Sequence, residues 1–292
     1  MSTLVADHAA CAAVLRRSGS NFALPIRLLP EAKRRGTTAL YAFCRRADDL
    51  VDDAADPAAA ATALSHFEQL VTGALAGADV DDPIVRALVD TVRRFAVPVE
   101  HILAVITGVR MDLERRTYET VADLEGYCRH VASAVGLAAT HIWGFTTREA
   151  LAVADDCGIA FQWTNILRDI PEDLGRGRIY LPAEDFARCG CAPDDLRQGR
   201  IGAPFAALAR LEVDRAAARY QRAAVLDRML STDGRLVFRA MFGIYGGLLA
   251  AVRQADIRIF SARVRARKPA VLAAAAATIL LGPRCPRAGS AT

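Results

Sequence analysis

Apolar residues recur at spacings of three and four along almost the whole 292-residue chain, whereas no segment alternates apolar and polar residues as a half-buried strand does. This pattern predicts an all-α protein. The expected helices span residues 31–55, 58–76, 82–96, 99–116, 120–145, 148–170, 201–229 and 233–262, followed by a short, mostly buried apolar helix over 270–282. Pro57, Pro83 and Pro98 stand at predicted helix starts, where the missing backbone N–H loses no helical hydrogen bond.

A single domain is expected over residues 1–282, with residues 283–292 forming a disordered polar tail. The one long irregular stretch, about residues 174–200, is rich in Gly, Pro and charged residues. Because composition does not change across this stretch, we interpret it as an ordered loop and not as a linker. A hydrophobic fraction of 53% against 24% charged residues argues against general disorder.

Charge and cysteine usage narrow the classes of function. The formal net charge of +4 is too small to indicate a nucleic-acid partner, so none is expected. The seven cysteines are odd in number and mostly lie in apolar runs, where a free thiol behaves as a small hydrophobic group. The N-terminus lacks the pattern of a signal peptide, and no uninterrupted apolar run reaches the ~20 residues of a membrane span. A reduced, cytoplasmic location is therefore expected.

The stretch FCRRADDLVDD, residues 43–53, gathers four aspartates on one predicted helix. Asp48 and Asp52 stand at i and i+4, and Asp49 and Asp53 form a second pair at the same spacing. Each like-charge pair at this spacing costs about 0.2–0.5 kcal/mol. Neighbouring arginines, a solvated helix face or a bound cation are the three ways to offset that cost.

A second acidic stretch, FQWTNILRDIPEDLGRGRIYLP, spans residues 161–182. Asp169 and Asp173 again stand at i and i+4, with Asn165 and Arg168 about one turn earlier. Carboxylates on two separate helices that face each other would suit Mg²⁺, which takes oxygen ligands together with substrate phosphates. The arginines beside both clusters suit either salt bridges or a diphosphate ligand. Two solvated, salt-bridged helix faces remain the alternative.

Four segments together resemble the squalene/phytoene synthase family. They are SGSNFALPIRLLP (18–30), ALYAFCRRADDLVDD (39–53), YCRHVASAVGLAATHIWGF (127–145) and FQWTNILRDIPEDLGRGRIYLP (161–182). The resemblance covers the chain from about residue 15 to residue 268, with the motifs in the family's order. It implies a single-domain isoprenoid synthase helical bundle with a central hydrophobic cavity.

The resemblance also implies roles for individual residues. Asp48, Asp52, Asp169 and Asp173 would be the catalytic metal ligands, holding Mg²⁺, with Mn²⁺ as an alternative ion. Tyr127 would be a further catalytic residue near the diphosphates. The implied substrate-binding residues are Phe22, Tyr41, Arg45, Gln162, Asn165, Arg168, Tyr245 and Arg263. Ser18 departs from the pattern, because some relatives have a histidine there.

The implied reaction is the head-to-head (1′-1) condensation of two identical prenyl diphosphates. We expect two farnesyl diphosphates, joined through presqualene diphosphate to a squalene-type C30 product, because the segments GLAATHIWGF and NILRDIPEDLGRGRIYLP resemble bacterial squalene-type members. The main alternative is a phytoene synthase that condenses two geranylgeranyl diphosphates. A non-catalytic member acting as a binding or assembly factor is a third interpretation, which the two intact acidic pairs disfavour. Use of NADPH stays open, since no GxGxxG motif marks a nicotinamide site.

Pro171 and the basic stretch at residues 253–268 lead to two further predictions. Pro171 lies inside the second acidic motif and is expected to kink or end its helix near Ile170, which would affect the orientation of Asp173. The basic stretch RQADIRIFSARVRARK, residues 253–268, is interpreted as a solvated helix face, with peripheral contact to anionic lipid at the inner membrane face as the alternative. Oligomeric state is not predicted.

Overall fold

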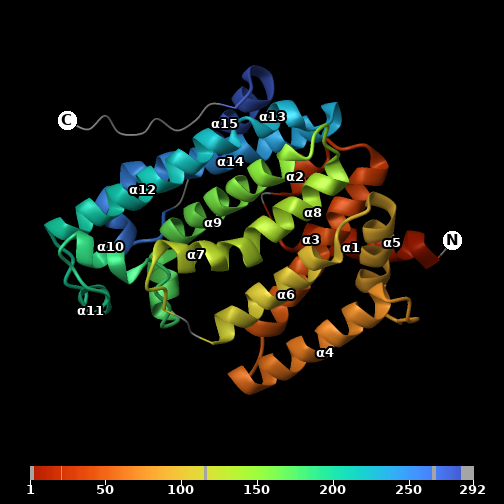
Figure 1. Ribbon diagram of the computed structural model, residues 1–292, viewed down its shortest axis with the longest axis horizontal. Helices are drawn as coiled ribbons and strands as arrows, with labels where there is room; N and C mark the ends of the chain where they lie inside the picture. Colours follow the sequence, from red (N-terminus) through yellow and green to blue (C-terminus); the bar gives the residue numbers. More distant parts are fainter. Residues whose placement is uncertain (1–2, 21, 115–116, 265–267, 284–292) are drawn as a thin grey trace. The chain divides into compact units, whose positions relative to one another are not determined.

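The computed structural model describes residues 3–20, 22–114, 117–264 and 268–283 (Figure 1). Within these residues the regular secondary structure is helical, apart from one antiparallel bridge between Phe145 and Leu230. The all-α prediction is thus confirmed. The predicted disordered tail falls, from residue 284 onward, outside the described residues.

The chain forms two compact units made of interleaved segments. Unit 1 comprises Met1–Glu114, Ala134–Leu151 and Arg228–Phe238, and unit 2 comprises Arg115–Ser133, Ala152–Asp227 and Arg239–Thr292. Two of the boundaries fall inside long helices, not in the irregular stretch 174–200. The expectation of one domain over residues 1–282 stays a prediction.

Unit 1 is built mainly from the N-terminal helices. They are α1 (Thr3–Arg17), α2 (Ala23–Ile26), α3 (Glu31–Asp52), α4 (Pro57–Leu75), α5 (Pro83–Phe95), α6 (Val99–Leu113) and α8 (Ala134–Trp143). Helices α1, α3 and α5 pack against one another (Figure 1). Asp56 and Asp82 cap α4 and α5. Each aspartate directly precedes a proline in the first helical turn, and its carboxylate accepts the backbone N–H groups of the two residues after that proline.

Lys33 joins separate segments of unit 1. Its Nζ donates to the carbonyl oxygen of Trp143 at 2.6 Å and to Asp233 Oδ1 at 2.9 Å. The indole N–H of Trp143 in turn donates to Thr37 Oγ1 at 3.1 Å. These bonds hold α8 and the start of α14 (Thr232–Ala255) against α3, the helix that carries the first acidic motif.

Unit 2 contains the remaining elements. They are α7 (Val121–Cys128), a π-helical turn η1 (Arg129–Ser133), most of α9 (Glu149–Gly175), α10 (Ala183–Arg188), α11 (Pro193–Arg197), α12 (Ala203–Ala223), most of α14, a 3₁₀ turn η2 (Asp256–Phe260) and α15 (Lys268–Leu281). The short α13 (Leu226–Met229) lies across a boundary between the units. By length and composition, Thr232–Phe260 passes as a membrane span, but half of its apolar window is buried within the protein.

Several predicted helices are confirmed with changed ends. The helix expected over 120–145 is interrupted by η1, and the one expected over 233–262 gives way to η2 after Ala255. Helices α1, α2, α10 and α11 were not predicted. The expected break near Ile170 is wrong, because α9 continues through Pro171 to Gly175. Pro171 removes a single backbone donor, while the buried side chains of Leu167 and Ile170 keep this part of the helix packed.

Candidate active site

The first acidic motif lies on the face of α3 that the core leaves uncovered. The opposite face is buried, including Leu40, Phe43 and Ala47, and this burial sets the rotation of the helix. Tyr41, Arg45, Asp48 and Asp52, at successive helical spacings of four, three and four, therefore share one stripe. The ring of Phe22 lies 6.1 Å from that of Tyr41, so the structure brings all five predicted residues of unit 1 to one side of α3.

Asp48 lies in an electrostatically unfavourable setting. Its side chain is exposed, yet enough protein surrounds the carboxylate to remove part of its hydration. This desolvation raises the pKa of Asp48 to about 7, and the charges of Asp52 and Asp112 add to the rise against the attraction of Arg45. Arg45 forms its ion pair with Asp49 instead, at 2.6 Å between Nη2 and Oδ1. The arginines of this helix therefore leave the repulsion at Asp48 only partly offset.

The second acidic motif lies on a half-exposed stripe of α9. Trp163, Leu167 and Ile170 are buried on the opposite side of this helix. The polar stripe carries Gln162, Asn165, Arg168, Asp169 and Asp173. Asn165 Nδ2 donates to Gln162 Oε1 at 3.3 Å, and Asn165 Oδ1 is buried with no protein partner. Since α9 is continuous, Asp169 and Asp173 keep their i, i+4 spacing.

Asp169 is paired with two arginines. Arg168 Nε donates to Asp169 Oδ1 at 2.8 Å, and a second nitrogen of the same guanidinium contacts Oδ2. Arg263 Nε lies 2.9 Å from Asp169 Oδ1, while its Nη1 donates to Glu172 Oε1 at 2.8 Å. The segment of Arg263 is also tied to α9 through its backbone, because Val264 N donates to the carbonyl of Arg168 at 3.3 Å.

Two further tyrosines predicted for the site lie in unit 2. Tyr245 of α14 stacks on Phe161 of α9, with ring centroids 4.2 Å apart and an interplanar angle of 4°. Burial raises the pKa of Tyr245, which therefore stays protonated at neutral pH. Tyr127 of α7 is only 3% exposed and lies in a cluster with Tyr118 and Tyr180, with centroid separations of 5.5 and 5.2 Å.

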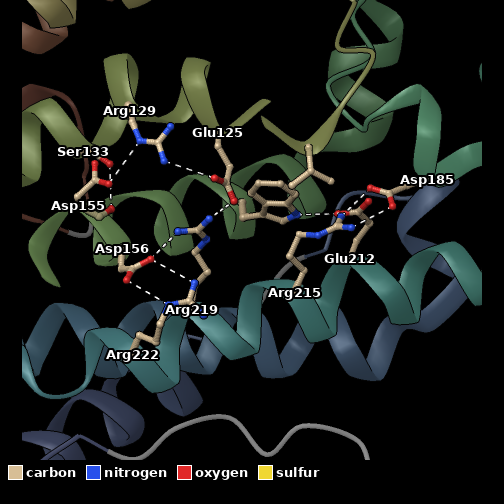
Figure 2. Close-up of polar contacts among 12 residues, drawn as sticks. Glu125, Arg129, Ser133, Asp155, Asp156, Asp185, Glu212, Arg215, Arg219 and Arg222 are labelled. Atoms are coloured by element: carbon tan, nitrogen blue, oxygen red, sulfur yellow. Dashed lines mark hydrogen bonds and ion pairs between the residues drawn. The ribbon is translucent and has the colours of Figure 1, made fainter. Parts of the chain in front are cut away.

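A charged network fixes α9 against its neighbours in unit 2 (Figure 2). Arg219 of α12 reaches Glu125 of α7 and lies 2.5 Å from Asp156 of α9. Arg129 lies 3.5 Å from Asp155. At Gly158 the helices approach so closely that a β-carbon there would lie 2.5 Å from Ser133 Cα. The position of Tyr127 relative to the stripe on α9 is thus set by these contacts.

A second group of polar contacts is buried on the far side of α9 (Figure 2). Trp163 Nε1 donates to Glu212 Oε2 at 2.8 Å, and Arg215 pairs with both Glu212 and Asp185 at 2.9 and 2.7 Å. Burial raises the pKa of Glu212 to about 7, with Arg215 opposing and Asp185 adding to the rise. This cluster fixes the rotation of α9, so that its polar stripe points away from α12.

Comparison with known proteins decides what these two motifs belong to. Residues 15–270 match the squalene/phytoene synthase family over most of the chain. The chain belongs to the squalene/phytoene synthase family. The resemblance carried by the four sequence segments is thereby confirmed.

The relatives by sequence include phytoene synthases. A 15-cis-phytoene synthase of Synechocystis is 36% identical over 278 residues, covering 89% of this chain and 80% of the relative. A phytoene synthase of Mycobacterium tuberculosis is 34% identical over 277 residues, covering 92% and 91% of the two chains. As a member of this family the protein is a prenyltransferase acting on prenyl diphosphates.

Solved structures of the family share the fold. A dehydrosqualene synthase in complex with ligand aligns with a TM-score of 0.84 at 30% identity, covering 94% of this chain and 95% of the other. A squalene synthase from Alicyclobacillus acidocaldarius aligns with a TM-score of 0.74 at 32% identity, covering 88% and 93%. The squalene/phytoene synthase chain therefore has the all-α isoprenoid synthase fold.

The donor atoms of both motifs suit a hard divalent cation. Within the described residues no group of three or more His, Cys, Asp or Glu side chains is arranged to hold a metal. Mg²⁺ does not require such a cage, since one or two carboxylates plus substrate phosphates are its usual ligands. A cation at the first motif would relieve the repulsion at Asp48, and a cation at the second would engage the unpartnered amide oxygen of Asn165.

Sequence reasoning missed several residues around these motifs. Asp112 of α6 acts on Asp48, and Tyr118 and Tyr180 enclose Tyr127. Glu172 shares Arg263 with Asp169. Tyr180 and Glu172 lie within the second acidic stretch and were available from its sequence, whereas Asp112 and Tyr118 stand in segments with no motif of their own.

Proposed function

We propose that this protein is a phytoene synthase that joins two geranylgeranyl diphosphates head to head. The observation that carries this proposal is the 36% identity to a 15-cis-phytoene synthase over 89% of the chain, together with further phytoene synthases among the relatives. This supports the alternative of the sequence analysis in preference to the farnesyl-based C30 product expected there.

The proposed roles follow from the two motifs. Asp48 and Asp52 of α3, and Asp169 and Asp173 of α9 with the amide of Asn165, would hold Mg²⁺. When bound, the ion supplies Lewis-acid stabilisation of the departing diphosphate. Arg45, Arg168 and Arg263 offer guanidinium groups, which pair with phosphate oxygens as they do with carboxylates.

The remaining predicted residues would orient the substrate and exclude water. Phe22, Tyr41 and Tyr245 present ring surfaces suited to a prenyl chain, and Gln162 adds an amide beside Asn165. Tyr127, buried among two other tyrosines, offers a phenol shielded from bulk solvent. A carbocation formed from an allylic diphosphate needs such shielding, because water would quench it. The central hydrophobic cavity belongs to this proposal.

Product analysis tests the assignment. Purified protein is incubated with Mg²⁺ and either geranylgeranyl or farnesyl diphosphate, each with and without NADPH, and the products are identified by mass spectrometry. Phytoene from geranylgeranyl diphosphate, formed without NADPH, is the expected result. A C30 product from farnesyl diphosphate alone would overturn the choice of substrate but not the family.

The C30 reaction is the second candidate, and two solved relatives of this type lend it support. The dehydrosqualene synthase and the squalene synthase named above both align at 30% identity or more. Dependence of the product on NADPH in the farnesyl diphosphate incubation would indicate a squalene-type reduction. Absence of turnover with every prenyl diphosphate, in protein that is folded, would support the non-catalytic interpretation instead.

A further inference from the structure

Helix α15 exposes an apolar surface to solvent, so the expectation that it is mostly buried is wrong. From Pro269 to Leu281 it contains no charged residue, and its one polar side chain, Thr278, is buried with its hydroxyl bonded to the carbonyl of Ala274. Leu272, Leu280 and Leu281 are 51%, 80% and 63% exposed. Leu280 and Leu281 are the two most exposed large hydrophobic residues of the described chain. Leu272, Ala276 and Leu280 stand four residues apart on one face of the helix and are all exposed. Exposed apolar surface of this kind marks an interaction site.

The helix is held firmly by its other face. A β-carbon at Gly243 of α14 would lie 2.7 Å from the carbonyl oxygen of Ala274 and 2.8 Å from Ala275 Cα, so the two helices touch backbone to backbone. Arg239 donates to the carbonyl of Ile279 at 3.1 Å and forms an ion pair with Asp227 at 2.6 Å. The last turn of α15 is thereby capped by a cation, and its leucines are presented on a packed element.

The charge of the surrounding sequence points to the chemistry of the partner. Seven of the 37 basic residues and none of the 33 acidic residues lie between residue 257 and the C-terminus. The first 256 residues therefore carry a net negative formal charge. Arg263 is engaged by Asp169 and Glu172, and Arg258 donates to the backbone carbonyls of Ala255 and Gln254. An apolar helix flanked on both sides by cations suits the interface of an anionic bilayer.

We propose that α15 docks the protein peripherally on an anionic membrane surface, with Leu272 and Leu280 entering the headgroup region. A second copy of the chain is disfavoured as the occupant, since a symmetric contact would bring two such cationic segments together. The inference needs only the surface of α15 and does not depend on the proposed activity. Docking would place an enzyme of apolar substrates at the phase in which they dissolve.

Vesicle co-sedimentation with the full chain tests the proposal. Wild type should sediment with phosphatidylglycerol-containing vesicles, less in high salt, and not with pure phosphatidylcholine vesicles. The double variant Leu272→Glu/Leu280→Glu should lower the vesicle affinity by at least about tenfold. Val225→Glu, at an exposed apolar position outside α15, is the matched control and should leave binding unchanged. Undiminished binding by the double variant would overturn the proposal.

Leu280→Trp provides a second measurement that does not require a destabilising charge. Both native tryptophans, Trp143 and Trp163, are buried, so a tryptophan at 280 reports its own surroundings. Its emission should shift to the blue on addition of phosphatidylglycerol vesicles. An unchanged emission would reject docking through α15. Self-association of lipid-free wild type, abolished by the double variant in sedimentation velocity, would instead assign this face to a second copy of the chain.

Discussion

On α3, Asp48 is surrounded by the further carboxylates Asp52 and Asp112, whereas on α9 Asp169 is paired with two arginines. Both motifs place two aspartates at i and i+4. Their electrostatic settings nevertheless differ, because neighbours outside each motif decide how its charge is met. The repulsion at the first motif is one that a bound cation would offset, while the second motif already has internal counter-ions that a metal and a diphosphate would displace.

This contrast explains why identical spacing does not imply identical behaviour without ligand. Arg168 and Arg263 hold Asp169 in place, so the second motif is ordered before substrate arrives. Asp48 lacks such a partner, since Arg45 pairs with Asp49. Substitutions in either motif should therefore lower turnover, whereas their effects on the free energy of unfolding without metal should be opposite.

The largest effect is expected on turnover. Asp48→Asn and Asp169→Asn should each lower kcat by about a thousandfold, because loss of a metal carboxylate removes several kcal/mol of charge stabilisation. Product formation from the preferred prenyl diphosphate is measured. Asp53→Asn, which changes an exposed acid off the stripe of Asp48 and Asp52, is the control and should stay near wild type. Near-normal activity in either variant would remove that residue from the proposed site.

Ligand-induced stabilisation comes next. Mg²⁺ with inorganic pyrophosphate should raise the Tm of wild type, with a stabilisation of about 2.7 kcal/mol at a hundredfold excess over Kd. Asp48→Asn should lose most of this shift, since its motif depends on the added cation. Differential scanning fluorimetry provides the measurement. An equal shift in wild type and Asp48→Asn would contradict the requirement for a cation at α3.

Metal-free stability should respond in opposite directions. In EDTA, Asp169→Asn should lower the free energy of unfolding by roughly 1–3 kcal/mol, since Arg168 and Arg263 lose a charged partner. Asp48→Asn should raise it, by at most about 1 kcal/mol because the side chain is exposed and screened by water. Urea unfolding gives both values. Destabilisation of similar size in both variants would abolish the distinction between the motifs.

The smallest effect is a pH dependence in unit 2, where two buried carboxylates share Arg215. The pKa of Glu212 is raised to about 7, so the folded protein binds its proton more tightly than the unfolded chain does. Its stabilising contribution is complete below the ordinary pKa of about 4.5 and is lost as pH rises through about 7. The Glu212→Gln variant has no titrating carboxyl at this position, so it does not lose stability for this reason as pH rises.

The stability of Glu212→Gln relative to wild type should therefore increase between pH 5 and pH 8, by the order of 1 kcal/mol. Urea unfolding of both proteins across this pH range measures the difference. A difference that does not vary with pH would show that Glu212 does not titrate there. Arg215 would then be sufficient to keep both carboxylates ionised over this pH range.

Much of the fold followed from local patterns. The long helices were predicted because their apolar residues repeat at helical spacing, and proline and aspartate marked several starts. Helices α10 and α11 were missed because at five or six residues they are too short to show such a period. Pro171 was expected to break α9, but its neighbours Leu167 and Ile170 are buried, and this packing overrides the local penalty.

For the candidate site, too, some residues were predictable from local sequence and others were not. The sequence predicted which aspartates share a helix face, since the i, i+4 spacing alone places Asp48 with Asp52 and Asp169 with Asp173. The roles assigned to these residues came from family resemblance and stay predictions. Asp112 and Tyr118 were not predicted, because they approach Asp48 and Tyr127 from other segments of the chain.

The helical class, the family and the residues of each motif could be read from the amino-acid sequence, because they depend on spacing along one helix or on local identity. The charge environment of each aspartate and the exposure of the leucines on α15 became known from the three-dimensional arrangement. Electrostatic interaction and burial depend on distance in space, which spacing along the chain does not give. Neighbours such as Asp112, Arg263 and Gly243 lie far from their partners in sequence.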